Sequence, residues 1–426
     1  MAESVLRASI ARDIPRVPGL DHSLQFLADP YRFIGNECDA LGTDVIRVRM
    51  MLQPMLCLRG PEAAALFYDK RRFKRAGAAP EPVRATLFGK GGVQTLDGAA
   101  HLARKQLFMT VCGPAATDAL VAIAGDEWRI CAAQWAGEQR FVLYPAAQAW
   151  LARSALRWAG IEVPRGGLAN CTADLVALFD QAAGGAAAHL HSRSARRRLE
   201  SWLARCVQQH RAGGECLPAG SPAALVAAAT DEQGQLLAPR IAAVELLNLV
   251  RPITAVSVFV TFAAHALHLH RSWRERLAQG SEADLDAFVQ EVRRFYPFFP
   301  AVAARVCEAF SWHGLHFPAG MRAMLDLHGT NHDPRAWVEP ETFRPERFGG
   351  GPPGLYTFVP QGGSRAEDHH RCPGEGMTVA LMKLAVRQLA AGCRYEVPRQ
   401  DLQVRMERMP AVPVSGMVLD RFAVTT

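Results

Sequence analysis

Residues 241–270 place the strongest constraint on how this chain can fold. The stretch reads IAAVELLNLVRPITAVSVFVTFAAHALHLH and has the apolar character of one long helix, except for Arg251 and Pro252 near its middle. A proline inside a helix removes a backbone donor and costs about 3 kcal/mol, and an arginine among apolar side chains needs a partner or water. Residues that break local rules in this way often mark functional or strained sites. The question is therefore what an arginine at a helix bend binds.

The composition indicates a soluble globular protein. Hydrophobic residues make up 49% of the 426 positions, which is enough for a large core. No uncharged apolar run reaches about 18 residues, and the N-terminal stretch MAESVLRASIARDIPRVPG has no apolar signal core, so we expect a cytoplasmic protein. The net charge of +7 comes without a long basic block, and the sequence therefore does not indicate a nucleic-acid partner.

The order of patterns along the chain predicts a mainly α-helical protein with small β-sheets near both ends. Within about residues 20–70, the runs DVIRVRM and PMLCLRG are typical of two strands joined by a turn. Helical periodicity dominates residues 97–295, where Asp97 is the predicted N-cap of the helix GAAHLARKQLFMTV. A final helix is predicted from about Gly376 to Leu389. Since no linker or internal repeat is present, we expect a single domain over residues 1–426.

One cysteine differs from the others in its surroundings. The ten cysteines include no Cys-x-x-Cys pair and no regular spacing, which disfavours a zinc site and a disulfide framework. Cys372 follows the segment FVPQGGSRAEDHHR and precedes the last predicted helix. Close backbone donors and a helix N-terminus lower the pKa of a thiol, so a thiolate is predicted here. It would act either as a nucleophile, with His369 or His370 as base, or as a single sulfur ligand of haem iron.

Further motifs precede this cysteine in a definite order. Glu291 and Arg294 lie three residues apart on a predicted helix, where they can form an ion pair that fixes the helix to the following segment. The motifs NHDP (331–334) and FRPERF (343–348) come next, and then the Cys372 loop. This series resembles the cytochrome P450 family over about residues 20–420. The resemblance implies a single-domain haem-thiolate fold, haem b as cofactor, Cys372 as the iron ligand, and residues 372–390 as the proximal loop and final helix.

The resemblance also implies contacts to the haem propionates. His101 and Lys105 are spaced i and i+4, so they share one face of a predicted helix that in this family offers a His or Trp and a basic residue to a propionate. Arg371, beside the cysteine, is the third expected cofactor-binding residue, with Arg365 as the alternative. Residues 364–370 make this loop longer than the usual form.

The long apolar helix departs from the usual family pattern. Conventional members carry an acidic residue and a threonine there, which deliver protons during oxygen activation, whereas this chain has LVRPI at 249–253. The Arg251-Pro252 pair resembles the fatty-acid peroxygenase branch, in which the arginine binds the substrate carboxylate and the carboxylate acts as acid and base for hydrogen peroxide. Pro252 is expected to kink the helix and direct Arg251 into the pocket. The alternative is that Arg251 pairs with Glu245 and Pro252 only bends a core helix.

The segment LFGKGGVQ at 87–94 supplies the remaining expected substrate contacts. In the resembled branch, glutamine at the position of Gln94 accompanies hydroxylation, whereas histidine marks members that decarboxylate to terminal alkenes. A neutral amide can hydrogen-bond to substrate or peroxide but does not exchange a proton near neutral pH. Phe88 is expected near the haem or the alkyl chain.

Taken together, the resemblance implies an enzyme that uses hydrogen peroxide to hydroxylate long-chain fatty acids at Cα or Cβ without a redox partner. Its expected catalytic residues are Arg251, Pro252 and Gln94, and its expected substrate-binding residues are Arg251, Phe88 and Gln94. Three alternatives stay open: a reductase-dependent P450 monooxygenase, a fatty-acid decarboxylase that releases terminal alkenes, and a non-catalytic haem protein that senses small ligands.

Overall fold

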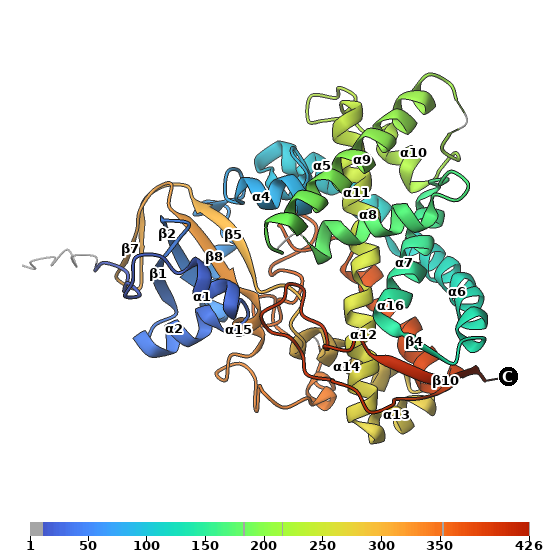
Figure 1. The fold of residues 1–426 in the computed structure, drawn as a ribbon. Helices are drawn as coiled ribbons and strands as arrows, with labels where there is room; N and C mark the ends of the chain where they lie inside the picture. Colours follow the sequence, from blue (N-terminus) through green and yellow to red (C-terminus); the bar gives the residue numbers. More distant parts are fainter. Residues whose placement is uncertain (1–11, 182–183, 215, 352, 426) are drawn as a thin grey trace, which may run out of the picture.

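The computed structural model describes residues 12–181, 184–214, 216–351 and 353–425. Most of the N-terminal stretch that was expected to contain no signal core lies outside these residues. The chain is mainly helical with small sheets, as predicted, while the single domain over residues 1–426 stays a prediction. Figure 1 shows a β-rich part, built from an early and a late segment, beside a larger helical part.

The helices outside the long apolar stretch are α1 (Ser23–Ala28), α2 (Phe33–Leu41), α3 (Pro61–Phe67), α4 (Glu81–Val83), α5 (Gly98–Val111), α6 (Pro114–Ala136), α7 (Leu143–Ala159), α8 (Leu168–Asp180), α9 (Ala186–Arg211), α10 (Pro222–Ala227), α13 (Arg271–Ala278), α14 (Glu282–Phe295), α15 (Leu327–Asn331) and α16 (Glu375–Arg387). Short helical turns cover Arg84–Phe88, Val93–Thr95, Pro345–Phe348 and Gln388–Gly392.

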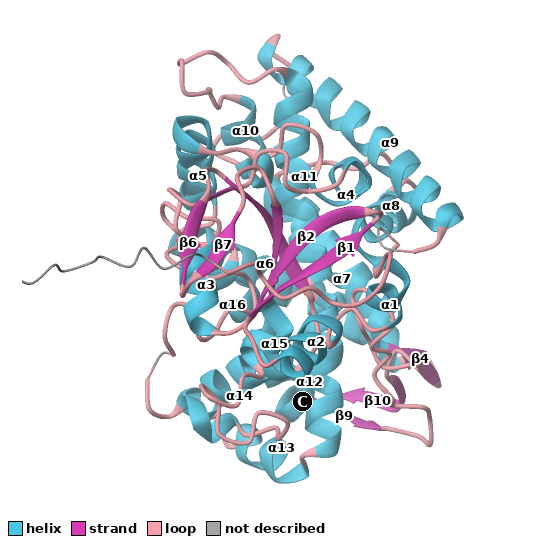
Figure 2. Cartoon of the chain, turned by 90° about the vertical axis from the view of Figure 1, so that its left-hand side faces the viewer, coloured by secondary structure: helices cyan, strands magenta, loops and turns pink. Residues whose placement is uncertain are grey.

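The largest sheet joins the two predicted N-terminal strands to strands from the later segment. The strand β1 (Val45–Met50) pairs antiparallel with β2 (Gln53–Leu58), and the turn between them is made by residues 51 and 52, both at positive φ. The strand β8 (Arg322–Asp326) then pairs parallel with β2, and β5 (Ala301–Val306) and β3 (Phe73–Lys74) complete the order β1-β2-β8-β5-β3. Figure 2 shows two smaller sheets, which consist of β4 (Arg140–Val142), β10 (Val418–Val424) and β9 (Cys393–Glu396), and of β6 (Phe310–Trp312) and β7 (Leu315–Phe317).

The long apolar stretch forms the inner helix of the molecule. Its two parts, α11 (Pro239–Ala255) and α12 (Ser257–Leu269), run through the middle of the helical part (Figure 1). The helix is long and apolar enough to cross a membrane, but 94% of its most apolar segment is buried inside the structure, as in the core helix of a soluble protein. The kink predicted at Pro252 is not a break in the helix, because Pro252 lies inside α11 and the interruption falls at Val256. The N–H of Val256 bonds to the carbonyl of Ile253, which closes a tighter turn there.

Two helix ends differ in detail from the expectation. The helix α5 begins where predicted, but the Asp97 side chain makes no capping hydrogen bond. Its carboxylate accepts instead from the backbone N–H groups of Arg75 and Ala76, so it connects α5 to the loop after β3. The final helix, α16, starts one residue earlier than predicted, at Glu375, and changes into a wider turn at Gln388.

The predicted ion pair between Glu291 and Arg294 is present on α14, with both side chains fully buried. The Nε and Nη2 atoms of Arg294 donate to the two carboxylate oxygens of Glu291 at 2.7 and 2.8 Å. Arg294 also donates to backbone carbonyls within residues 331–342, and Glu291 accepts from the backbone N–H of Arg344. The pair therefore holds α14 against the irregular segment that precedes the Cys372 loop.

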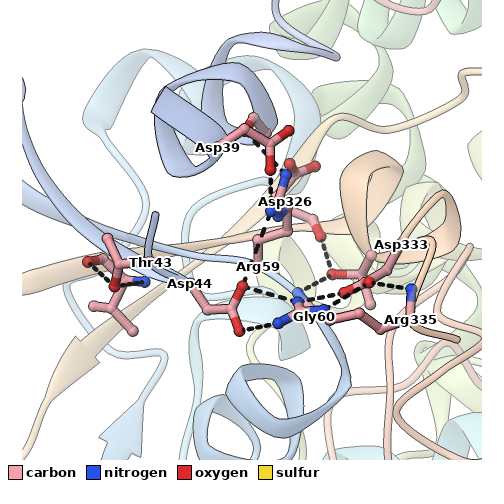
Figure 3. A network of polar contacts seen from close by, with 11 residues as sticks. Asp39, Thr43, Asp44, Arg59, Gly60, Asp326, Asp333 and Arg335 are labelled. Atoms are coloured by element: carbon pink, nitrogen blue, oxygen red, sulfur yellow. Dashed lines mark hydrogen bonds and ion pairs between the residues drawn. The ribbon is translucent and has the colours of Figure 1, made fainter. Parts of the chain in front are cut away.

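A second polar network connects the large sheet to the same irregular segment (Figure 3). Arg59, directly after β2, donates to the carboxylate of Asp39 at the end of α2 at 2.6 Å. Arg335 donates to both oxygens of Asp44, which precedes β1, and also to Asp333. These five residues help to line an external cleft of about 360 Å³.

Asp326 is the most deeply buried acid of this network. It ends β8, and one of its oxygens accepts from the N–H of Gly329 at 2.7 Å while the other has no hydrogen-bond partner. Burial raises the pKa of Asp326 to about 7, against the opposing effects of the Gly329 N–H and the Arg59 charge. The ionised form of this side chain is therefore disfavoured in the folded protein.

Candidate active site around Cys372 and Arg251

The Cys372 loop brings the sulfur to the start of α16. The N–H of Cys372 donates to the carbonyl of Gln361 at 3.0 Å, and the backbone N–H of Gly374 hydrogen-bonds to the sulfur. The predicted lowering of the thiol pKa is wrong for the chain by itself, because burial and then the negative charge of Glu375 raise the pKa of Cys372. A metal ion deprotonates a coordinating thiol outright, so the role of an iron ligand does not depend on a low pKa of the free thiol.

The two histidines beside Cys372 are engaged in other contacts. His369 Nδ1 lies 2.8 Å from a carboxylate oxygen of Asp368, and the ring of His370 stacks on His101 with 3.9 Å between the centroids. No histidine in the described part of the chain hydrogen-bonds to the sulfur, and no cluster of three His, Cys, Asp or Glu side chains there could hold a metal ion. The geometry therefore favours a single sulfur ligand over a cysteine nucleophile. The stacking also gives the long loop a structural role, since it packs against α5.

The face of α5 that carries His101 and Lys105 meets the Cys372 loop. Both side chains are buried, and Lys105 Nζ donates to the backbone carbonyl of Arg371. Burial lowers the pKa of Lys105 to about 8, and within the described ranges no carboxylate forms an ion pair with it. A buried ammonium group without a carboxylate partner fits a haem propionate. Arg371 is less available for that role, because its Nε and Nη2 atoms donate to Glu375, and Arg365 is exposed and pairs with Asp368.

A hydrogen-bonded chain of side chains connects the segment before α5 with α11. Asn248 Nδ2 donates to Gln94 Oε1 at 3.2 Å and to Glu245 Oε2 at 2.9 Å. The other oxygen of Glu245 accepts from Arg104 Nη1 on α5. Because Asn248 precedes Arg251 by three residues on the same helix, this chain links Gln94 to the part of α11 that carries the arginine. The contact of Gln94 with the substrate stays a prediction.

Arg251 is buried without a complete set of partners. Its Nε atom has no hydrogen-bond partner, and burial, together with the positive charge of Arg196, lowers the pKa of Arg251 to about 9. The Cys372 sulfur acts on the pKa of Arg251 in the opposite direction. The alternative in which Arg251 pairs with Glu245 is wrong, because the carboxylate oxygens of Glu245 bind Arg104 and Asn248.

The buried charges around Arg251 do not balance. Three buried guanidinium groups, on Arg104, Arg196 and Arg251, face two buried carboxylates, on Glu200 and Glu245, between α5, α9 and α11. Arg196 Nε lies 3.1 Å from Glu200 but without hydrogen-bond geometry. An unpaired charge in a protein interior is costly, so this region is suited to receive one anion.

The segment from Phe88 to Gln94 packs closely on α11. Phe88 is half-buried at the end of the turn Arg84–Phe88. A Cβ atom on Gly92 would lie 2.8 Å from Asn248 Nδ2 and 2.9 Å from the Phe88 carbonyl oxygen, so only glycine permits this approach. Pro252, next to Arg251, is half-buried as well. The structure thus packs the segment that carries Phe88 and Gln94 against the helix that carries Arg251.

Three polar residues of this site were not predicted: Arg104, Arg196 and Asn248. Asn248 stands one helical turn before Arg251 in the same apolar stretch, so helical spacing could have identified it. Arg104 and Arg196 carry no local signal, because their partners are contributed by elements distant in the sequence.

Comparisons with known proteins agree with this arrangement. The family model described as Cytochrome P450 matches residues 285–416. Cytochrome P450 716A75 of Maesa lanceolata is 30% identical over 133 residues, which is 31% of this chain and 26% of that protein, so the chain spans about a quarter of the length of such curated relatives.

The similarity to solved structures extends over the whole fold. The structure of cytochrome P450SP alpha (CYP152B1) in complex with (R)-ibuprophen superposes with a TM-score of 0.93 at 43% identity, covering 95% of this chain and all of that chain. Cytochrome P450EX alpha (CYP152N1), determined with myristic acid, gives a TM-score of 0.93 at 37% identity, covering 97% of this chain and all of that one.

The helical fold, the cysteine at the start of α16 and the buried cations of α5 define a haem-thiolate oxidoreductase. The chain belongs to the cytochrome P450 family, within its fatty-acid peroxygenase branch. This membership implies thiolate-ligated haem iron as the cofactor. The residues available to hold it are Cys372 for the iron and His101 and Lys105 for the propionates.

Proposed function

We propose that this protein uses hydrogen peroxide to hydroxylate long-chain fatty acids at Cα or Cβ, with haem b as the cofactor and without a redox partner. The observation that carries the proposal is Arg251, a buried arginine with an unpartnered Nε in a region that contains one more buried cation than buried anions. A fatty-acid carboxylate supplies the missing negative charge. Myristic acid in the similar P450EX alpha structure supports this substrate class.

Each residue near Arg251 has a distinct part in the proposed reaction. The planar guanidinium of Arg251 pairs with the carboxylate through two parallel hydrogen bonds, which fixes Cα and Cβ at a set distance from the head group. The bound carboxylate takes up and returns the proton of the peroxide, the task that an acid-alcohol pair performs in conventional members. Pro252 leaves one backbone hydrogen bond of α11 unmade beside the arginine, and Phe88 packs on the alkyl chain. When bound, haem supplies the oxidising iron, and a thiolate ligand favours cleavage of the O–O bond.

Gln94 favours hydroxylation over decarboxylation in this proposal. Its Oε1 accepts from Asn248, which leaves its Nε2 as the donor for the carboxylate or the peroxide. The amide does not change protonation near neutral pH and therefore holds substrate without providing a second proton acceptor. We also propose a cytoplasmic location, which is consistent with the burial of the long apolar helix.

The test is a turnover assay of the purified holoenzyme with myristic acid and hydrogen peroxide, without any reductase, and with mass spectrometry of the products. We expect 2- and 3-hydroxy acids from the wild type and no product from Arg251→Leu, whose haem spectrum stays unchanged. The matched control is Arg240→Leu, because Arg240 lies on the same helix but is exposed; it should retain activity.

Three results would contradict the proposal. Full activity of Arg251→Leu would refute the role of the arginine. Terminal alkenes as main products would favour decarboxylation. A wild type with a haem-thiolate spectrum but no peroxide-driven product would favour a reductase-dependent monooxygenase or a ligand sensor.

A further inference from the structure

Arg196 is a second buried cation of the site whose nitrogens make no hydrogen bonds, although a carboxylate oxygen of Glu200 lies 3.1 Å from its Nε. It lies on α9 with an exposed fraction of 2%, and its Nε, Nη1 and Nη2 atoms have no hydrogen-bond partner. Arg193, one turn earlier on the same helix, shows the usual situation, because its side chain is about one-third exposed and donates to Glu81. Leaving every nitrogen of a guanidinium without an acceptor is costly, so the position of Arg196 requires an explanation.

The guanidinium of Arg196 lies beside Gly89, which also packs on α11. A Cβ atom on Gly89 would lie 2.5 Å from Arg196 Nη2 and 2.5 Å from a methyl group of Val244. Gly89 has φ of +82°, a conformation that glycine adopts without strain. It opens the stretch Gly89-Lys90-Gly91-Gly92, whose last member packs on Asn248. Arg196 therefore contacts the segment that carries Gln94, and that segment packs on the helix that carries Arg251.

The charges around Arg196 come from three elements. Glu200 lies one turn further along α9, Arg240 and Glu245 come from α11, and Lys90 comes from the Gly89–Gly92 stretch. Glu245 is already bound by Arg104, so Glu200 is the one carboxylate left to compensate Arg196. The positive charge of Arg196 attracts a carboxylate bound to Arg251, Glu200 offsets part of this attraction, and the offset disappears if Glu200 loses its charge.

We propose that Arg196 is a positioning residue for the substrate carboxylate, which adds a second buried positive charge behind Arg251 and keeps the Gly89–Gly92 stretch closed on α11. The inference rests on the proposed function in one respect, namely that Arg251 binds the carboxylate. Arg196 acts through its field and through Gln94. It is not placed in contact with the substrate.

The consequence is a substrate carboxylate that stays ionised to lower pH. A nearby positive charge favours the charged form of an acid, so it lowers the pKa of the bound fatty acid. Removing that charge should weaken binding. It should also move the acid limb of the pH profiles, which is the fall of affinity and of turnover rate on the acidic side, to higher pH. At an effective dielectric constant of about 20, two opposite charges attract each other by about 1.4 kcal/mol at a separation of about 12 Å, which corresponds to about tenfold in affinity.

The experiment is equilibrium dialysis of labelled myristic acid against the holoenzyme between pH 5 and pH 8. We expect Arg196→Met to bind about tenfold more weakly, with the acid limb at higher pH, and Arg196→Lys to restore most of the affinity because it restores the charge. The control Arg193→Met should match the wild type. Affinity of Arg196→Met within twofold of the wild type, with an unchanged acid limb, would overturn the inference.

A variant with the opposite expected effect on affinity still tests the inference if Arg196→Met does not fold. Glu200→Gln removes the carboxylate that compensates Arg196, so we expect tighter binding and an acid limb at lower pH. Unchanged or weaker binding of Glu200→Gln would refute the inference. Arg251→Leu distinguishes a failure of the proposed function from a failure of the role of Arg196. If Arg251→Leu keeps wild-type affinity, the proposed function itself is wrong. If Arg251→Leu loses affinity but Arg196→Met does not, only the role of Arg196 is refuted.

Discussion

Replacing Asp326 with asparagine should make the stability of this protein less dependent on pH. Asp326 is buried beside Arg59 at the junction of the large sheet and the irregular segment before the Cys372 loop (Figure 3). Burial has the largest effect on its pKa, which rises from 3.8 to about 7, although the N–H groups of Gly329 and His328 and the charge of Arg59 act in the opposite direction. The folded protein therefore holds a proton that the unfolded chain releases at lower pH.

The sign of the effect follows from this difference. The stability contributed by the protonated acid is complete below pH 3.8 and is lost as the pH rises through about 7. The full difference in pKa corresponds to about 4 kcal/mol, of which more than half is lost between pH 5 and pH 8. For a chain of this length, that loss lowers Tm by about 3 °C. Asparagine keeps the acceptor for Gly329 but cannot ionise.

The measurement is Tm of the holoenzyme and of Asp326→Asn at pH 5 and pH 8, followed by circular dichroism at one heating rate. Between the two pH values, we expect Tm of the wild type to fall about 3 °C more than Tm of the variant. The difference in Tm between the two proteins at a single pH also includes the effect of replacing a carboxyl oxygen with an amide nitrogen. The change in Tm between pH 5 and pH 8 is therefore the informative quantity. Equal pH dependence in the two proteins would refute the reasoning.

Three further predictions concern the site and its support. Glu291→Gln should lower the free energy of unfolding by about 3 to 5 kcal/mol, measured by urea denaturation, because Arg294 would keep a buried charge without a counter-ion. Gly92→Ala should weaken binding of myristic acid while leaving the far-ultraviolet circular dichroism spectrum unchanged, because the added Cβ meets Asn248 and displaces the segment that carries Gln94. Cys372→Ser should remove the thiolate signature from the haem spectrum without unfolding the chain.

Each of these has a control on the same protein. Asp126→Asn removes an exposed i, i+3 partner of Arg129 and should cost less than about 0.5 kcal/mol. Gly125→Ala adds a methyl group where no atom lies within 4 Å and should bind the fatty acid normally. Cys216→Ser should keep the thiolate signature. A loss as large in the control as in the test variant would contradict the corresponding prediction.

Much of the architecture could be predicted because its signals are local. Strand alternation predicted β1 and β2, and periodicity predicted α5 and the inner helix. The order of Glu291, Arg294 and Cys372 indicated the family, since these positions depend on spacing along one chain segment. Helix bounds were predicted to within a residue or two where capping and periodicity agree.

Local signals failed where a distant partner competed for the same atoms. Asp97 has the sequence context of an N-cap, yet its carboxylate binds the backbone N–H groups of Arg75 and Ala76, because the fold brings that loop within 3 Å. The thiol of Cys372 was expected to be acidic from its position at a helix start, but burial and the nearby Glu375 outweigh the backbone donor. Sequence spacing contains no measure of burial.

The sequence by itself determined that an arginine and a proline stand in the middle of a buried helix, and that a lone cysteine precedes the last helix. Only the tertiary structure decided which partners Arg251 has. In the folded chain, Glu245 binds Arg104, which lies 141 positions away in the sequence. Arg196, on another helix, is close enough for its charge to affect Arg251. The physical reason is that charge balance is a property of a volume, and the residues that share that volume are chosen by packing between elements.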